Sequence, residues 1–408
     1  MMINLFFIDI AIAGSMNGVT RCVQLLADSF SKERGFRVTW IRFESKMTKA
    51  IIRRQNEGYL LIEIPLPEDL GSFLCSPARK QAYWNDAYES ISQEMMPQGR
   101  MILHLHTLNL IDFALIVRHH QPCKIVSHLH CIPWKALYNR NPTHFMHLYE
   151  MYYIKKDYSK PQAFITHSHE RLSYTQSDCI ICVTRCARDF IRKMCPHHSA
   201  IHVVYNGISD LILDETALCR HSHQPINCLF VGNAHASKGL EFVLQALDRL
   251  LMKYEISIYV AGGYSYALRE EIISRHPFLN IWFTGLLPMS KLQDYYLSCD
   301  IGLIASLQEQ CSYVAIEMMM FGMPVITTNV DGLHELFAKK GCCISIPVQN
   351  NPGGLLQPDI EKMSTAISSL ACQPKMREQM GHKARERYKR FYKKDKMIQS
   401  IKDIYLSL

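Results

Sequence analysis

Short apolar runs rich in β-branched and aromatic residues alternate with longer amphipathic segments along most of the chain. The short runs are typical of buried strands, and in the longer segments the apolar residues recur at helical spacing. This alternation predicts parallel sheets covered by helices on both faces. The predicted strands span 3–12, 36–43, 59–64, 101–105, 124–129, 179–183 and 201–204, then 227–231, 256–261, 281–283, 301–305, 325–328 and 342–346, and the clearest helices span 18–32, 77–95 and 238–252. The expected fold class is therefore α/β, with two doubly wound units.

A polar stretch, YNGISDLILDETALCRHSHQPIN, separates the two sets of strands. It contains the turn-forming pair Asn206-Gly207, and Pro225 precedes the next strand. A chain of 408 residues is also longer than one hydrophobic core usually serves. We expect a first domain at 1–205, a linker at 206–225, a second domain at 226–385 and a terminal helix at 386–408. The two domains are expected to face each other across a cleft, with ligands at the carboxyl ends of the strands.

The formal net charge of +8 is concentrated near the C-terminus. Between Lys375 and Lys396 there are ten Lys or Arg residues against three Asp or Glu residues. Helix-forming residues with apolar positions at helical spacing predict a terminal helix that packs on the body and keeps a solvated basic face. Peripheral contact of that face with anionic lipid headgroups is the alternative. No aromatic-interleaved or zinc-finger pattern accompanies the charge, so nucleic acid is not an expected partner.

The sequence shows no run of about 18 apolar residues, so it does not predict a membrane span. Its first residues, MMINLFFIDIAIAGS, lack a basic beginning and carry Asp9 inside the apolar run. We interpret them as a buried strand rather than a signal peptide. The fifteen cysteines are an odd number spread through strand-like and helix-like segments, which is typical of reduced, buried thiols. These features predict a cytoplasmic protein.

Two patterns raise the question of a metal site. Cys179, Cys182 and Cys186 lie close together, but their surroundings are typical of a buried strand and no second CxxC follows. The other pattern is His-x-His, whose two histidines share one face of a strand and can chelate. The pairs are His104/His106, His128/His130, His167/His169 and His221/His223. We interpret them as strand-end histidines that face a polar cleft, and we expect no metal.

The stretch SLQEQCSYVAIEMMMFGMPVITT carries two carboxylates in an otherwise apolar run. Ser312 is a suitable N-cap for a helix at 313–321, and Gly322 ends that helix before the strand. Backbone N–H groups at the start of such a helix favour an anion. Glu309 precedes the cap and Glu317 lies one turn into the helix, so both can point toward the same ligand. Carboxylates beside an anion site indicate acceptors for the hydroxyls of a ribose or a hexose.

This arrangement, with seven residues between the glutamates and GLHE at 332–335 after the next strand, resembles the E-x7-E signature of the retaining family 4 (group 1) glycosyltransferases. The resemblance extends over the whole chain and is strongest from about 227 to 336. It implies the GT-B fold of two Rossmann-like domains, in which the first domain serves the acceptor and the second binds the nucleotide-sugar donor. It also implies that the terminal helix crosses back to the first domain.

The resemblance implies roles for several residues of the second domain. The segment FVGNAHASKGLEF places Lys238 where the family has a diphosphate-binding Lys, but Asn233 stands where the family has Arg. Glu309 is implied to hold donor sugar hydroxyls and Glu317 the ribose hydroxyls. Lys238 and the helix amides would stabilise the departing diphosphate. The remaining donor-binding residues are Ser312, Tyr313, Gly232, Gly262 and Gly263.

In the first half, GSMNGVTRCVQLLADSF resembles the family's glycine loop and first helix, at Gly14, Asn17 and Gly18. Small residues there let the backbone approach an acceptor. His130 follows a strand at the place where the family has a histidine near the donor sugar, and His106 ends the preceding strand comparably. We predict that His130 is a catalytic residue together with Glu309 and Lys238.

The expected function is transfer of a hexosyl-type sugar from a nucleoside diphosphate to an acceptor hydroxyl, with retention at the anomeric carbon. The donor is expected to be a UDP- or GDP-sugar, the acceptor a glycan, lipid-linked saccharide or protein, and no cofactor is expected. Two alternatives stay open. One is a nucleotide-sugar epimerase or phosphorylase on the same fold, and the other is a nucleotide-sugar-binding partner without catalysis, because Asn233 removes a fixed charge.

Overall fold

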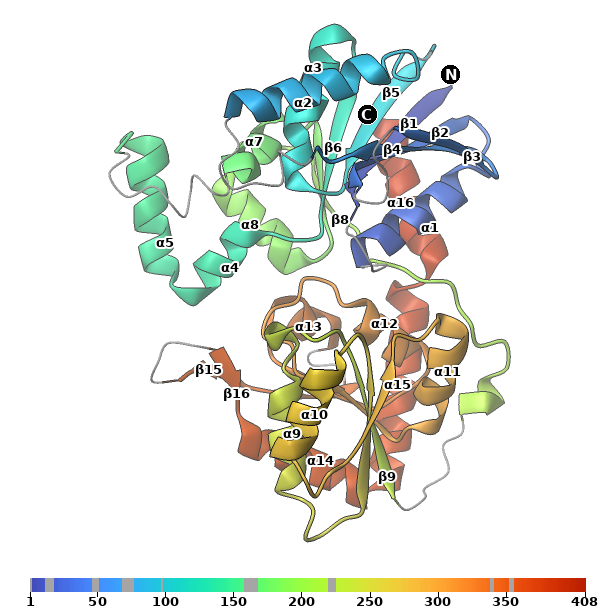
Figure 1. The fold of residues 1–408 in the computed structure, drawn as a ribbon, viewed down its shortest axis with the longest axis vertical. Coiled ribbons are helices and arrows are strands. Elements are labelled where there is room, and N and C mark those ends of the chain that lie inside the picture. Colours follow the sequence, from blue (N-terminus) through green and yellow to red (C-terminus); the bar gives the residue numbers. More distant parts are fainter. Residues whose placement is uncertain are drawn as a thin grey trace. The chain divides into compact units, whose positions relative to one another are not determined.

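The computed structural model describes residues 2–11, 18–45, 51–67, 77–96, 98–157, 168–218, 225–337, 341–351 and 356–408. The chain forms two compact units (Figure 1). The first unit contains Met1–Val204 together with Ile398–Leu408, and the second contains Tyr205–Met397. Each unit is built on a mainly parallel sheet with helices on both faces (Figure 1). The predicted α/β class with two Rossmann-like units is confirmed.

The sheet of the first unit has the order β3-β4-β2-β1-β5-β6-β7-β8 in the described residues. All of its neighbouring strands are parallel except the β3–β4 pair. Its strands are β1 (Ile3–Ile10), β2 (Phe36–Ser45), β3 (Ile52–Asn56), β4 (Tyr59–Pro65), β5 (Arg100–Leu105), β6 (Lys124–Leu129), β7 (Cys179–Cys182) and β8 (Ile201–Val203). The chain therefore starts in the middle of the sheet and builds first one side and then the other.

Helices cover both faces of this sheet because each parallel connection must cross over it. They are α1 (Gly18–Phe30), α2 (Pro77–Ser90), α3 (Ile111–His120), α4 (Pro133–Arg140), α5 (Pro142–Tyr149), α7 (Ser168–Gln176) and α8 (Arg185–Met194), with short turns η2 (Leu108–Leu110) and η3 (Glu150–Ile154). Helix α1 buries an apolar stripe that includes Cys22, Leu26 and Phe30. This stripe fixes which face of α1 meets the sheet.

The second unit has a sheet in the order β11-β10-β9-β12-β13-β14, and its strand pairs are all parallel. Its strands are β9 (Ile226–Val231), β10 (Ile256–Ala261), β11 (Asn280–Gly285), β12 (Ile301–Ile304), β13 (Val325–Thr328) and β14 (Cys343–Ile346), and β15 (Val348–Asn350) pairs separately with β16 (Leu356–Pro358). Its helices are α9 (Leu240–Asp248), α10 (Tyr266–Arg275), α11 (Met289–Ser298), α12 (Tyr313–Met320), α13 (Asp331–Phe337), α14 (Ile360–Cys372) and α15 (Pro374–Phe391), with turns η4 (Glu215–Leu218) and η5 (Ala236–Lys238). This strand order is that of the Rossmann fold.

Two local predictions differ from the structure. Strand β3 was not among the predicted strands, because its sequence IRRQN is polar and mostly exposed. The predicted helix at 238–252 is divided at Gly239, whose φ of 74° ends η5 before α9 begins. A Cβ atom at Gly239 would lie 2.2 Å from the carbonyl oxygen of Ala305, so the close approach of these two loops requires glycine.

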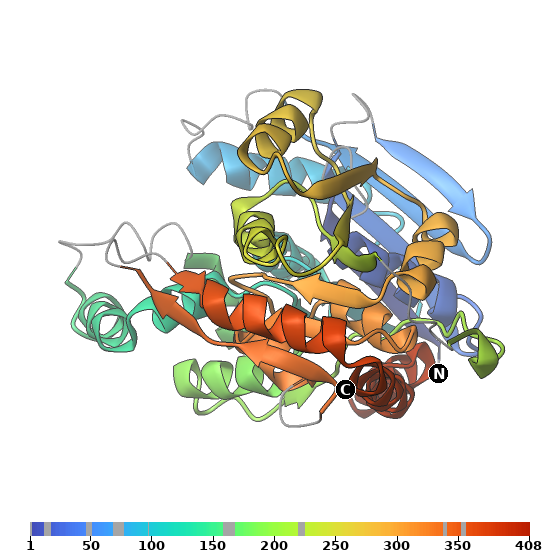
Figure 2. The same ribbon diagram turned by 90° about the horizontal axis from the view of Figure 1, so that it is seen from below.

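The C-terminal segment forms two helices rather than one. Helix α15 belongs to the second unit, and α16 (Lys394–Ser407) belongs to the first unit from Ile398 onward. In Figure 2 the dark-red α16 is seen nearly along its axis, and its Tyr405 ring lies 5.2 Å from that of Phe30 in α1. The described part of the predicted linker belongs to the second unit, where Ile208 is buried and bridges to Lys393.

The basic C-terminal segment keeps a solvated face that includes Lys375, Lys383 and Arg390, as the sequence predicts, but two of its arginines are buried. Arg377 and Arg385 are only 4% and 3% exposed. Arg385 donates to Asp210 at 2.8 Å and also pairs with Glu215 at 3.1 Å. Part of the positive charge therefore stabilises the second unit, since a buried guanidinium requires such partners. None of the helices in the described part of the chain combines the length and hydropathy needed to span a bilayer.

Candidate functional site

The second sheet places two loops next to each other at its carboxyl edge. The chain leaves β9 toward β10 on one side and later returns to the other side of β9 as β12. Ligands of open α/β sheets bind at such a switch point, outside the carboxyl ends of the strands. Both loops carry residues predicted from the sequence, and the amide of Leu307 donates to the carbonyl of Ser237 at 2.8 Å to join them.

The structure brings Lys238 and Glu309 together. The Nζ atom of Lys238 donates to Oε2 of Glu309 at 2.9 Å. Their side chains keep exposed fractions of 38% and 15%, so both are within reach of a ligand. Lys238 ends the turn after β9 and Glu309 lies in the loop after β12. The pairing of a cation with a carboxylate holds each side chain in a defined position without using all of its hydrogen-bonding capacity.

Helix α12 begins at the predicted cap. The hydroxyl of Ser312 accepts from the amide of Ala315 at 3.3 Å, and Tyr313 is the first helical residue. Glu317, further along the helix, is only 2% exposed and accepts from the hydroxyl of Tyr296 at 2.6 Å. The predicted capped helix is confirmed. Its N-terminus follows Glu309 by a few residues and supplies partial positive charge at this edge of the sheet.

The glycine-rich strand ends pack backbone against backbone. A Cβ atom at Gly262 would lie 2.0 Å from the carbonyl oxygen of Gly232, so these two loops meet only because Gly262 lacks a side chain. The side chain of Asn233 accepts from the amide of Gly263 at 3.0 Å. Asn233 thus ties the ends of β9 and β10 together, a contact that an Arg side chain has no acceptor to make.

Two buried amide side chains near this loop were not among the predicted site residues. Gln310, between the two glutamates, is 8% exposed, and within the described residues neither its oxygen nor its nitrogen has a hydrogen-bond partner. Asn206 donates to the carbonyl of Cys311 at 3.4 Å, while its own oxygen has no partner in the same part of the chain. Buried polar atoms normally have partners. The position of Gln310 inside the E-x7-E spacing was the available sequence signal.

Helix α13, which carries the GLHE stretch, also contacts this region. The amide of Gly332 donates to the carbonyl of Glu309 at 3.0 Å. Glu335 accepts from the hydroxyl of Tyr205 at 2.6 Å. The first contact holds the backbone carbonyl of Glu309, and the second holds the side chain of Glu335 in α13.

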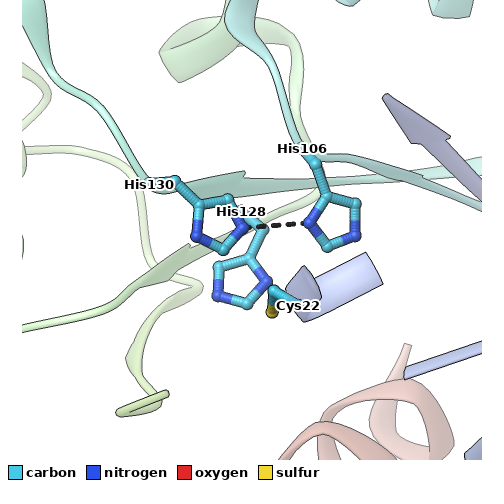
Figure 3. Close-up of side chains that lie close together, drawn as sticks. All are labelled: Cys22, His106, His128 and His130. Carbon is cyan, nitrogen blue, oxygen red and sulfur yellow. Dashed lines mark hydrogen bonds between the residues drawn. The ribbon is translucent and has the colours of Figure 1, made fainter. Parts of the chain in front are cut away.

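In the first unit, four side chains converge where β5 and β6 end. They come from α1, from the residue after β5, from β6 and from the residue after β6, and we call them the histidine–cysteine cluster: Cys22, His106, His128 and His130 (Figure 3). Nδ1 of His106 lies 3.0 Å from Nε2 of His130. His104, on the same face, contacts the hydroxyl of Tyr405 instead. The predicted placement at strand ends is confirmed for His106 and His130, but these histidines face one another inside the unit rather than a polar cleft.

Burial lowers the pKa of these imidazoles. The pKa values of His104, His106 and His128 lie well below the usual 6.5, first because burial disfavours the charged ring and then because neighbouring imidazoles repel a second charge. Burial lowers the pKa of His130 to about 4. All four rings are neutral at pH 7, so each has a nitrogen lone pair to offer.

The other predicted residues of the first half are placed as follows. Gly18 is the exposed first residue of α1, and Gly14 and Asn17 lie outside the described residues. Cys179 and Cys182 are buried in β7, as the strand interpretation of that run predicts. Within the described residues, the histidine–cysteine cluster is the one group of metal-ligating side chains close enough to share an ion.

Known proteins resemble this chain in sequence and in fold. An uncharacterized glycosyltransferase of Methanocaldococcus jannaschii is 25% identical over 287 residues, which are 61% of this chain and 70% of that protein. Other curated relatives are matched over 48% and 61% of their lengths. The solved structure of sucrose-phosphate synthase from Thermosynechococcus elongatus superposes with a TM-score of 0.74 at 15% identity, covering 98% of each chain. HepE of Anabaena, solved in complex with UDP-glucose, has a TM-score of 0.68 at 12% identity, covering 99% of this chain and 100% of that one.

Two protein-family models match consecutive parts of the sequence. Residues 16–210 match Glycosyltransferase Family 4, and residues 220–387 match Glycosyl transferases group 1. Together they cover both Rossmann-like units, and the whole-chain superpositions agree with them. The chain therefore belongs to the group 1 glycosyltransferases of the GT-B fold.

Proposed function

We propose that this glycosyltransferase moves a hexosyl-type sugar from a nucleoside diphosphate to an acceptor hydroxyl with retention of anomeric configuration. The observation that carries the proposal is the Lys238–Glu309 pair at the switch point of the second sheet, beside the capped start of α12. A fixed cation and helix amides suit a diphosphate, and the carboxylate suits sugar hydroxyls. The complex of HepE with UDP-glucose supports a nucleotide sugar as the donor.

In the proposed reaction, Lys238 and the first-turn amides of α12 take up the charge that develops on the departing diphosphate. Glu309 orients the sugar by accepting from its hydroxyls, and Glu317 accepts from the ribose. His130 lies near the donor sugar in this proposal. The leaving phosphate takes the acceptor proton, so the chain needs no separate general base. The acceptor is a hydroxyl of a glycan, a lipid-linked saccharide or a protein.

A donor screen tests the proposal. Thermal unfolding of the full chain is followed with UDP-, GDP- and ADP-sugars, and slow hydrolysis of each donor is measured alongside. We expect one nucleotide class to raise the unfolding temperature, because a ligand that binds only the folded state stabilises it. The product formed with an accepted hydroxyl should keep the donor's anomeric configuration by NMR. Epimerisation of the donor sugar without any acceptor, inversion at the anomeric carbon, or binding without turnover would each contradict the proposal.

Replacing Glu317 with Gln should weaken donor binding by roughly 10- to 100-fold, because hydrogen bonds to a charged group contribute about 1.5–3 kcal/mol. The variant retains an oxygen to accept from Tyr296, so the fold of α12 should persist. Isothermal titration with the nucleoside diphosphate alone measures the effect. Tyr296→Phe is the matched control, since it removes the internal partner and keeps the carboxylate. Equal affinities of wild type and Glu317→Gln would remove Glu317 from the donor site.

A further inference from the structure

We propose that the histidine–cysteine cluster binds one zinc ion. Its four potential ligand atoms, one thiol sulfur and three imidazole nitrogens, all lie within 4.8 Å of one another. Figure 3 shows that the three rings and the thiol lie close together. They come from α1, β5 and β6 and their ends, so the ligands are distant in sequence and are brought together by the sheet order.

The spacing of the nitrogens suits a tetrahedral ion. Two imidazole nitrogens bound to one zinc ion at its usual bond length are about 3.3 Å apart. Nδ1 of His106 and Nε2 of His130 are 3.0 Å apart. If this distance increased by a few tenths of an ångström, the ion would fit between the two nitrogens. Rotation of the two side chains can provide that increase.

Unmet hydrogen-bonding capacity points independently to a ligand. His128 is only 2% exposed, and within the described residues neither of its ring nitrogens has a hydrogen-bond partner. Buried polar atoms without partners are rare and destabilising. A cation would use one nitrogen lone pair on each ring.

The chemical nature of the four ligands indicates which class of metal ion the site would bind. Imidazole and thiolate suit zinc and similar transition ions, whereas magnesium and calcium prefer oxygen ligands. Four protein ligands close a tetrahedral zinc site, which is typical of a structural ion rather than a catalytic one. The thiol of Cys22 would lose its proton on binding, so loading should release one proton to solvent.

The ion would tie α1 to the carboxyl edge of the first sheet. Cys22 lies in the second turn of α1, and His106 and His130 directly follow β5 and β6. The inference does not rest on the proposed function. A zinc-bound His130 keeps a second ring nitrogen, whose N–H can still donate to a sugar hydroxyl.

Cobalt substitution tests the site in the full chain. Protein stripped with a chelator under reducing conditions is titrated with Co²⁺. We expect saturation at one Co²⁺ per chain, with the visible bands of tetrahedral cobalt and a thiolate-to-cobalt charge-transfer band in the near ultraviolet. Zn²⁺ should abolish both signals at equimolar concentration and raise the unfolding temperature of the stripped protein.

Substitutions identify the ligands. Cys22→Ser should lose the charge-transfer band and weaken Co²⁺ binding at least tenfold, and His128→Gln should weaken it comparably. Cys186→Ser is the matched control, because this thiol lies in α8, outside the cluster, and its loss should leave the spectrum unchanged. His169→Gln, on α7, controls for loss of a histidine elsewhere.

Two kinds of result would overturn the proposed zinc site. A charge-transfer band that persists in Cys22→Ser, or one that disappears in Cys186→Ser, overturns the assignment of the site. Failure of wild-type protein to bind Co²⁺ or Zn²⁺ in a saturable 1:1 complex overturns it as well. Should a variant fail to fold, the wild-type stoichiometry, its charge-transfer band and its zinc-dependent unfolding temperature decide.

Discussion

Replacing Lys238 with Ala should lower kcat for sugar transfer by roughly 10²–10³-fold, the usual effect of removing one preorganised group that stabilises transition-state charge. In the loop at 232–239, Lys238 is the only side chain with a permanent positive charge, because Asn233 occupies the place of the family Arg. The substitution also releases Glu309 from its partner at 2.9 Å. Steady-state kinetics with the donor found by screening measure the loss.

The control for this experiment is Lys291→Ala, which removes an exposed lysine from α11 of the same unit. It should leave kcat within about twofold of wild type, since surface substitutions away from a site usually have small effects. Lys238→Arg keeps the charge and should retain more activity than Lys238→Ala. If kcat of Lys238→Ala stayed within a few-fold of wild type, Lys238 would not act on the leaving group.

Replacing Glu170 with Gln should stabilise the first unit at alkaline pH. Glu170 is 1% exposed, and its carboxyl accepts from the amide of Trp134 at 2.7 Å and from the hydroxyl of Tyr174 at 2.5 Å. Burial raises the pKa of Glu170 from its ordinary value of 4.5 to about 8, and the two hydrogen bonds oppose this only in part. Between pH 4.5 and about 8, Glu170 therefore keeps its proton in the folded protein, whereas the same side chain has released it in the unfolded chain.

The sign of the pH dependence follows from this difference in bound protons. Between pH 4.5 and about 8 the folded state binds more protons at Glu170, so the free energy of unfolding falls as the pH rises. The slope is about 1.4 kcal/mol per pH unit for one group. A glutamine side chain cannot ionise, so the advantage of Glu170→Gln should grow from near zero at about pH 5 to a few kcal/mol at about pH 8.5.

Denaturant unfolding at about pH 5, 6.5 and 8.5 measures this effect. Tryptophan fluorescence reports mainly on the first unit, because Trp40, Trp84 and Trp134 are buried there and Trp282 of the second unit is 54% exposed. Glu57→Gln, in an exposed turn, is the control and should leave the pH dependence of unfolding unchanged. Parallel pH profiles for wild type and Glu170→Gln would show that Glu170 does not hold its proton in the folded state.

Local sequence was sufficient wherever the determining interactions span few residues. The cap at Ser312, the helix that follows it and the strand at 325–328 were predictable, because capping and hydrophobic period act over one or two turns. The edge strand β3 was not, because a polar strand that is mostly exposed lacks the alternation that marks a buried face. The requirement for glycine at position 239 was not predictable either, because it arises from the close approach of Ala305, which is distant in sequence.

The candidate site, too, was predictable from the sequence only in part. The sequence spacing places Glu309 and Glu317 around one helix start, but the contact of Glu309 with Lys238 depends on β9 and β12 being neighbours. The unpaired amide of Gln310 likewise becomes visible only once its surroundings among the described residues are known.

The sequence by itself determined the two α/β units, the E-x7-E helix and the family, because these depend on local period, capping and short motifs. The tertiary structure alone decided which distant side chains meet. His106 and His128 each share a strand face with another histidine, yet the parallel pairing of β5 and β6 and the packing of α1 gather them with Cys22. Sheet order is a non-local property, since it is fixed by how crossover helices bury their apolar faces rather than by any single segment.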